Sequence, residues 1–231
     1  MEATSSVSLY WIIFIGTALL SWIVQYTLQS KFRKYSKISI SAGLTGAEVA
    51  RKMLAENGIT DVQVISVRGR LTDHYNPTTH TVNLSEGVYG SNSIMAAAVA
   101  AHECGHALQH ATGYAPLKMR SALVPAVHFA SQWVMLLILA GMIMINTFPQ
   151  LMLTGIVLFA MTTLFSFITL PVEINASKRA LAWLNTTGIT NYETHPMAAD
   201  ALKSAAYTYV VAAITSLATL LYYITLFSRR R

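Results

Sequence analysis

The sequence predicts a mainly α-helical membrane protein, with about four transmembrane helices and a small α+β region that holds a short β-sheet. Of its 231 residues, 54% are hydrophobic and 11% are charged, whereas about a quarter of the residues of a soluble domain carry a charge. Four apolar runs contain no Lys, Arg, Asp or Glu: Leu9–Leu28, Leu123–Ile145, Leu151–Leu170 and Ala205–Phe227. Each is long enough for a helix rising about 1.5 Å per residue to cross a hydrocarbon core of about 30 Å.

The first run predicts a membrane anchor rather than a cleaved signal peptide. Its leader, MEATSSVS, has no basic residue, and the run is longer than the apolar core of a signal peptide. The chain then divides into an anchor (1–28), a cytoplasmic-side region (29–122), a transmembrane hairpin (123–171), a helix (172–204) and a C-terminal transmembrane helix with a basic tail (205–231).

The distribution of basic residues predicts the orientation of the chain in the cell membrane. Ten of the 16 lie between the first and second apolar runs, and three more lie between the third and fourth. Four spans place both segments on one face, and the positive-inside tendency makes that face cytoplasmic. The tail SRRR at 228–231 opposes this assignment, because four spans leave it outside. The net charge of +6 is explained by contact with anionic membrane lipid and requires no nucleic acid.

Between the first two spans, the sequence predicts a helix, a small sheet and a second helix. Thr45 and Glu48 form a capping box for a short helix that Asn57-Gly58 ends. The β-branched residues at 60–84, with a turn at Asn76-Pro77, predict a small sheet or hairpin. An alanine-rich helix of about 20 residues follows, with Ser91 or Ser93 as its cap and Gly113 at its end.

The sequence HECGH, at 102–106, lies in the middle of that second helix. Residues four apart lie on one face of a helix, so His102 and His106 can direct both imidazoles at one divalent ion. Glu103 points about 100 degrees away from His102 and can act as a general base on a water at the open side of that ion. The spacing therefore predicts a zinc site with two histidine ligands and a base.

Glu173 is the predicted third ligand. It follows Pro171, where the third span is expected to end, and a carboxylate so close to lipid needs a charged partner or a metal. Pairing with Lys178 or Arg179 is the alternative. His110 lies too far along the helix axis from His102 to share one ion. The weaker candidates are Asp73, His74, His80, Glu193 and His195.

Three segments together resemble the YugP-type membrane zinc metallopeptidases of bacteria. They are LTDHYNPTTHTVNLSEGVYG, HECGHALQHATGYAPLKMRSALVP and TLPVEINASKRA, in that order. More distantly, HExxH followed by ExxAS is similar to the HtpX and CAAX prenyl protease group, in which the later glutamate is the third zinc ligand. That resemblance implies a gluzincin and a zincin-like catalytic region. Ser177 stands where that group has aspartate.

The resemblance implies a zinc-dependent endopeptidase that acts on a protein or peptide substrate in or near the membrane. It also implies that an edge strand, assigned to His80–Ser85, pairs with the substrate backbone. A strand that merely completes the sheet is the alternative. Residues that could stabilise the oxyanion are His74, His195, Tyr207 and Tyr209.

Two other functions remain open from the sequence. A non-proteolytic zinc-binding scaffold would favour four protein ligands, often cysteine, and Cys104 is the only cysteine. It is expected to be a small buried residue. A metal or proton transporter would favour ionisable residues within the spans, where His128 stands alone.

Overall fold

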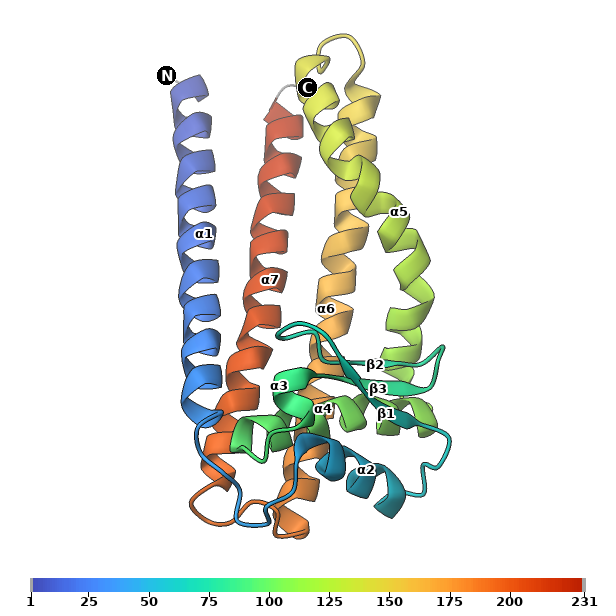
Figure 1. The fold of residues 1–231 in the computed structure, drawn as a ribbon. Coiled ribbons are helices and arrows are strands. Elements are labelled where there is room, and N and C mark those ends of the chain that lie inside the picture. The colour runs from blue at the N-terminus through green and yellow to red at the C-terminus, as the bar shows by residue number, and fades with distance from the viewer. Residues whose placement is uncertain (1, 230–231) are drawn as a thin grey trace. The chain divides into compact units, whose positions relative to one another are not determined.

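A computed structural model describes residues 2–229. Its four long helices are α1 (Glu2–Tyr35), α5 (Ala115–Ile143), α6 (Pro149–Thr186) and α7 (His195–Arg229) (Figure 1). The shorter elements are α2 (Gly46–Glu56), β1 (Gln63–Val67), β2 (His74–Asn76), β3 (Thr81–Ser85), α3 (Glu86–Tyr89) and α4 (Ile94–Ala111). The chain forms two compact units. The helical unit comprises Met1–Val24, Met119–Leu170 and Thr208–Arg231, and the sheet unit comprises Gln25–Lys118 and Pro171–Tyr207.

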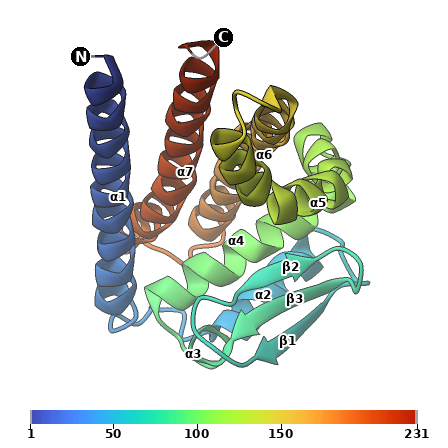
Figure 2. The ribbon, with the colours of Figure 1, turned by 90° about the horizontal axis from the view of Figure 1, so that it is seen from above.

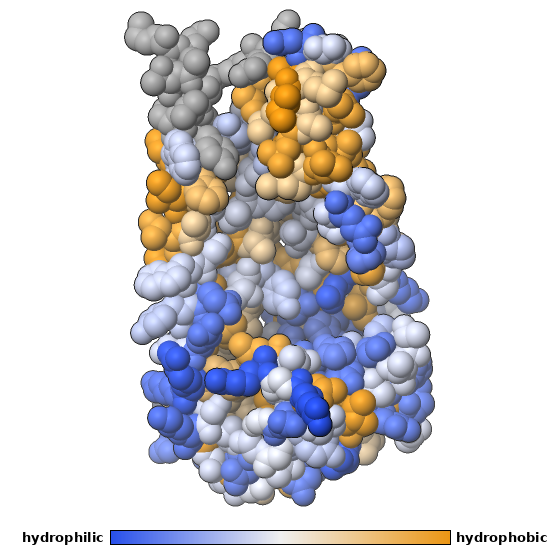
Figure 3. Space-filling model, turned by 45° about the horizontal axis from the view of Figure 1, so that its top comes forward, coloured by the Kyte–Doolittle hydropathy of each residue, from blue (hydrophilic) through white to orange (hydrophobic). Residues whose placement is uncertain are grey.

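All four long helices are long and apolar enough to span a membrane, judged by length and composition. Many of their large apolar side chains face outward: Ile12 is 69% exposed and Met135 is 63% exposed. Figure 3 shows the resulting apolar surface over the α5–α6 hairpin. Exposed apolar side chains of this density fit a lipid environment. The predicted fold class, a mainly α membrane protein with a small sheet, is therefore confirmed.

Two glycines allow α5 and α6 to pack closely within the helical unit. A Cβ at Gly141 would lie 2.4 Å from the Met152 nitrogen, and one at Gly155 would lie 3.0 Å from the Ile138 nitrogen. Small residues at such contacts are typical of membrane helix pairs, in which van der Waals packing drives association. The hydroxyl groups of Thr163 and Ser216 lie 2.7 Å apart and add a hydrogen bond between α6 and α7.

The sheet unit contains a mixed three-stranded sheet in the order β1-β3-β2. Strand β3 pairs with β1 in parallel and with β2 in antiparallel orientation. Helices α2 and α4 pack together over one face of this sheet, with α4 against β2 and β3 (Figure 2). The assignment of His80–Ser85 as an edge strand is wrong, because β3 is the central strand. The outer strands are β1 and β2, and β2 lies beside α4.

The ends of the two helices in this layer are formed by the predicted residues. Thr45 and Glu48 make both hydrogen bonds of a capping box at α2. The Ser93 hydroxyl accepts a hydrogen bond from the Ala96 N–H at the start of α4. Gly58 and Gly113 follow the two helices with positive φ values of 71° and 65°, which glycine adopts at little cost. Both helix predictions are confirmed.

The expected helix boundary at Pro171 is wrong. Helix α6 continues through Pro171 to Thr186, and α7 begins only at His195, so residues 172–204 do not form one helix. One proline removes a single backbone hydrogen bond. Beyond it, α6 buries a continuous stripe with four-residue spacing. The stripe consists of Val172, Ala176, Ala180 and Leu184, all without exposed surface. Burial of this stripe stabilises the helix beyond the proline.

Candidate metal centre

Helix α4 places His102 and His106 side by side. They lie one turn apart, and their ring centroids are 4.8 Å apart with the ring planes nearly perpendicular. The alanines of this helix are buried where α4 packs against α2 and the sheet. The two imidazoles are therefore fixed on a rigid, buried element.

Helix α6 brings Glu173 to the same point. Its Oε2 lies 3.3 Å from His102 Nε2 and 3.5 Å from His106 Nε2. Glu173 is 3% exposed. Arg179, an alternative partner for Glu173, contacts another residue: its Nε donates a hydrogen bond to Asn175 Oδ1 at 2.9 Å.

Gly105 permits this approach of α6 to α4. A Cβ at position 105 would lie 2.6 Å from the Ala176 carbonyl oxygen, which is closer than a side chain can come. Ala176 is three residues after Glu173, so the contact lies within one turn of the carboxylate. The glycine inside the HECGH motif thus allows the Glu173 carboxylate to reach the two histidines.

The geometry of these three residues fits a zinc ion. Their ligand atoms all lie within 4.8 Å of one another, and no other group of three such residues among positions 2–229 meets that condition. Zn–N and Zn–O bonds of about 2.0–2.2 Å in a tetrahedron put neighbouring ligand atoms about 3.3–3.6 Å apart. The separations of Glu173 Oε2 from the two Nε2 atoms match this value, and the remaining pair of ligand atoms lies within 4.8 Å. Three protein ligands with one open vertex is the arrangement of a catalytic zinc site.

Each histidine is held from behind by a polar side chain. Ser177 Oγ lies 3.1 Å from His102 Nδ1 and forms a hydrogen bond with this imidazole. Gln109 Oε1 lies 3.0 Å from His106 Nδ1. Both contacts occupy Nδ1 and leave Nε2 directed at Glu173. Such outer partners fix the tautomer and the ring orientation of metal ligands.

Gln109 was not recognised from the sequence. It is fully buried, and its Nε2 donates to the Val172 carbonyl at 2.8 Å and to Asn175 Oδ1 at 3.0 Å. The available signal was its spacing: it follows His106 by three residues and therefore lies on the same side of α4.

Glu103 is oriented by the sheet rather than by the histidines. Its Oε2 accepts a hydrogen bond of 3.0 Å from the Tyr75 backbone N–H in β2, and Glu103 is 8% exposed. One backbone donor on one oxygen leaves Oε1 available to accept a proton. This carboxylate is not among the three ligand atoms, but it is close enough for its charge to act on His106.

The carboxylates give the site a strong preference for positive charge. Burial acts to lower the pKa of His106, but its contact with Glu173 and the charges of Glu103 and Glu173 outweigh burial. The pKa of His106 therefore lies above its ordinary value. The same negative surroundings favour a divalent cation.

Comparison with known proteins identifies the family. A sequence model of the family described as "Putative neutral zinc metallopeptidase" matches residues 10–228. The chain belongs to this family. It is also 46% identical over 212 residues to the "Putative membrane protease YugP" of Bacillus subtilis (strain 168), which covers 92% of this chain and 93% of that protein. No solved structure matches the chain.

In this member of the zinc metallopeptidase family, the weaker ligand candidates have other neighbours. Asp73 accepts hydrogen bonds from the N–H and hydroxyl of Ser85, and His80 Nδ1 lies 2.7 Å from Asp61. His74 Nδ1 lies 2.8 Å from the Thr72 carbonyl and His195 Nδ1 lies 3.0 Å from the Thr190 hydroxyl. His110 contacts the Tyr75 hydroxyl, and Glu193 is exposed. None of them joins the His102–His106–Glu173 group in residues 2–229.

Cys104 is buried as expected. The residue has no solvent-exposed surface, and its Sγ lies 3.5 Å from the Ala50 carbonyl oxygen. Burial raises the pKa of the Cys104 thiol far above its ordinary value, so the thiolate that would bind metal is disfavoured. In this family member, the cysteine of the motif packs α4 against α2.

Proposed function

We propose that this protein is a membrane-embedded, zinc-dependent endopeptidase that hydrolyses peptide bonds of membrane or membrane-adjacent proteins. The observation that carries the proposal is the convergence of His102, His106 and Glu173, with their three ligand atoms within 4.8 Å, beside the carboxylate of Glu103. Family membership and the similarity to YugP support the same reaction class.

Each residue of the site has a distinct task in this proposal. His102, His106 and Glu173 hold the zinc ion, while Ser177 and Gln109 fix the two imidazoles. When bound, zinc supplies Lewis acidity, which makes a water more acidic and polarises the scissile carbonyl. Glu103 accepts the proton of the attacking water at its free oxygen and passes that proton to the leaving amine.

The outer edge of β2, on the side away from β3, is the proposed place for the substrate backbone. Tyr75 pairs with Val82 on one side of β2, and its N–H points on the other side to Glu103. An extended peptide beside this edge would lie along the catalytic carboxylate, with main-chain hydrogen bonds that depend little on its sequence. This replaces β3 as the strand that receives substrate. The positive-inside tendency places the site on the cytoplasmic face in this proposal.

The decisive test is Glu103→Gln, which preserves size and removes the base. Loss of a general base typically slows a reaction by about 10²–10⁴-fold, so cleavage of casein by the purified protein should fall at least a hundredfold. Zinc content, measured by elemental analysis, should remain at the wild-type value because Glu103 is not a ligand. Glu86→Gln, at an exposed glutamate of α3, is the matched control and should cleave normally. Wild-type cleavage by Glu103→Gln would refute the mechanism.

A further inference from the structure

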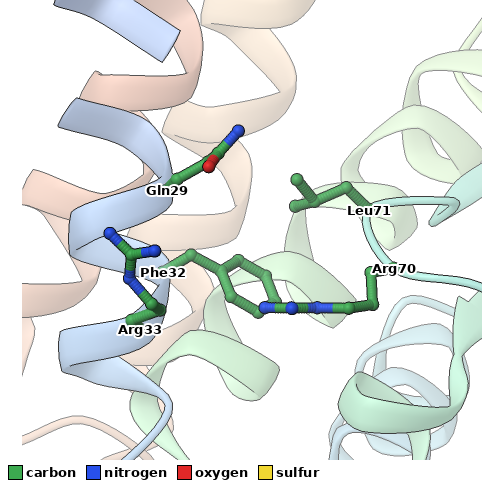
Figure 4. Close-up of a pocket in the computed structure, with 5 residues that line it drawn as sticks. All are labelled: Gln29, Phe32, Arg33, Arg70 and Leu71. Atoms are coloured by element: carbon green, nitrogen blue, oxygen red, sulfur yellow. The ribbon is translucent and has the colours of Figure 1, made fainter. Parts of the chain in front are cut away.

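A second candidate site lies away from the metal centre, between the end of α1 and the loop that follows β1. It is a cavity of about 230 Å³ lined by Gln29, Phe32, Arg33, Arg70 and Leu71 (Figure 4). Figure 4 shows Arg70 extending from the loop toward the Phe32 ring, with Arg33 on the other side of Phe32. Two guanidinium groups and two apolar side chains thus line one small space.

Neither arginine is neutralised within the part of the chain that the structure describes. The side chains of Arg33 and Arg70 have no hydrogen bond, ion pair or ring contact among residues 2–229. Other basic side chains of the same unit do have partners. Lys31 forms an ion pair with Asp200, and Arg51 donates a hydrogen bond to the Tyr89 hydroxyl at 2.7 Å. Both side chains are exposed, so their hydrogen-bond donors are available to a ligand. An anion in this cavity would accept charge-assisted hydrogen bonds from both guanidinium groups.

The backbone of the loop also indicates a built site. Leu71 has a φ of 58°, a left-handed conformation that is unfavourable for a residue with a Cβ. Its side chain is 47% exposed, yet it lines the cavity rather than the core. A strained residue at a cavity is typical of a ligand-binding segment.

The position of the cavity selects the kind of anion. Arg33 lies in the last turn of α1, five residues after the uncharged run that ends at Leu28 and inside the first candidate span, Trp11–Tyr35. At this end of a span, a side chain meets phospholipid headgroups. Guanidinium groups bind phosphate with paired hydrogen bonds, and Phe32 and Leu71 provide apolar surface for the glycerol and the first acyl carbons.

We propose that this cavity binds the headgroup of an anionic phospholipid, with Arg33 and Arg70 on its phosphate. The site is independent of zinc and of peptide cleavage, so it can be measured in the Glu103→Gln protein. A failed lipid site and a failed peptidase mechanism would then be separate results.

Lipid binding is best measured on the full-length Glu103→Gln protein in neutral detergent, by native mass spectrometry after titration with phosphatidylglycerol or phosphatidylcholine. We expect one phosphatidylglycerol to be retained with clear preference over phosphatidylcholine. Each of Arg33→Gln and Arg70→Gln should weaken that binding by about tenfold, since hydrogen bonds to charged groups contribute at this level. Arg70→Lys keeps the charge but not the paired geometry, and should weaken it less.

The matched control removes the same charge elsewhere. Arg51→Gln with Lys52→Gln removes two cations of α2 that already have partners, Tyr89 and Glu56, and should leave lipid binding unchanged. The proposal would be overturned if this control lost as much phosphatidylglycerol binding as the Arg33→Gln/Arg70→Gln protein, since net charge alone would then explain binding. Displacement of the lipid by millimolar inorganic phosphate or by an acidic peptide would also overturn it. Unchanged unfolding temperatures would exclude misfolding.

Discussion

Gln109 connects the two helices of the metal centre through a single buried amide. Its Nε2 donates to the Val172 carbonyl and to Asn175 Oδ1, both acceptors, so its Oε1 must face His106 Nδ1. His106 therefore carries a proton on Nδ1, which leaves Nε2, on the side of Glu173, as the nitrogen that can bind zinc. A residue that touches no ligand atom thus sets which nitrogen is available for zinc.

Gln109→Leu should therefore weaken zinc binding while leaving Glu103 in place. It keeps approximate volume but removes the acceptor for His106 Nδ1, and loss of such a partner typically costs about 10–100-fold in metal affinity. Competition between the purified protein and a chelator for zinc measures this change without any assay of cleavage. Gln63→Leu, at an exposed position of β1, is the control. Equal zinc affinity in both variants would show that Gln109 only fills space.

At the scale of elements, the distance between α4 and α6 decides whether Glu173 reaches the histidines. Gly105→Ala would place a Cβ 2.6 Å from the Ala176 carbonyl oxygen and 3.1 Å from its carbonyl carbon. Backbone atoms cannot rotate away as a side chain can, so the helices must separate. Overpacking of this kind costs about 1–3 kcal/mol of stability, and the shift should also move Glu173 away from the ligand position.

The expected outcome of Gly105→Ala is a lower unfolding temperature together with weaker zinc binding. Calorimetry and zinc competition measure the two effects. Gly87→Ala is the control, since a Cβ there would meet no atom within 4 Å. A Gly105→Ala protein with wild-type values in both measurements would mean that α6 can shift without affecting the site.

The sequence predicted those elements whose signals are local. Thr45, Glu48 and Ser93 sit at the helix starts they predicted, because a cap depends on residues within one turn. The HECGH spacing predicted which side chains share a face of α4 for the same reason. The approach of Glu173 was predicted from the cost of a carboxylate near lipid, and the structure brings this residue to the two histidines.

Features that depend on distant parts of the chain were not predicted correctly. The β-branched residues of 60–84 indicated that this segment forms strands. They did not indicate the strand directions: β3 pairs with β2 in antiparallel orientation and with β1 in parallel orientation. Pro171 indicated a helix end, yet the buried stripe from Val172 to Leu184 continues α6. Gln109 gained its importance only when α6 placed Val172 and Asn175 against it. Each case is a tertiary contact overriding a local preference.

At the scale of the whole molecule, the distribution of charge predicts which side of the membrane each segment faces. The segments between the first and second spans and between the third and fourth carry 13 of the 16 basic residues. The short turn between α5 and α6 carries none. Arg230 and Arg231, which oppose this orientation, lie outside the described residues. The basic residues near the ends of the first two spans should dominate, because charges within about 20 residues of a span set orientation. They are Lys31, Arg33, Lys34, Lys37, Lys118 and Arg120.

Cysteine labelling tests this orientation directly. Cys104 is the only cysteine of the sequence, so a Cys104→Ala protein gives a background without thiols. Tyr192 is 95% exposed between α6 and α7, and Asn146 is exposed in the α5–α6 turn. In intact cells, a membrane-impermeant maleimide should label Asn146→Cys but should label Tyr192→Cys only after permeabilisation. The reverse pattern would put the metal centre outside the cell. The peptidase would then act on extracellular substrates, and the arginine cavity would face the outer leaflet.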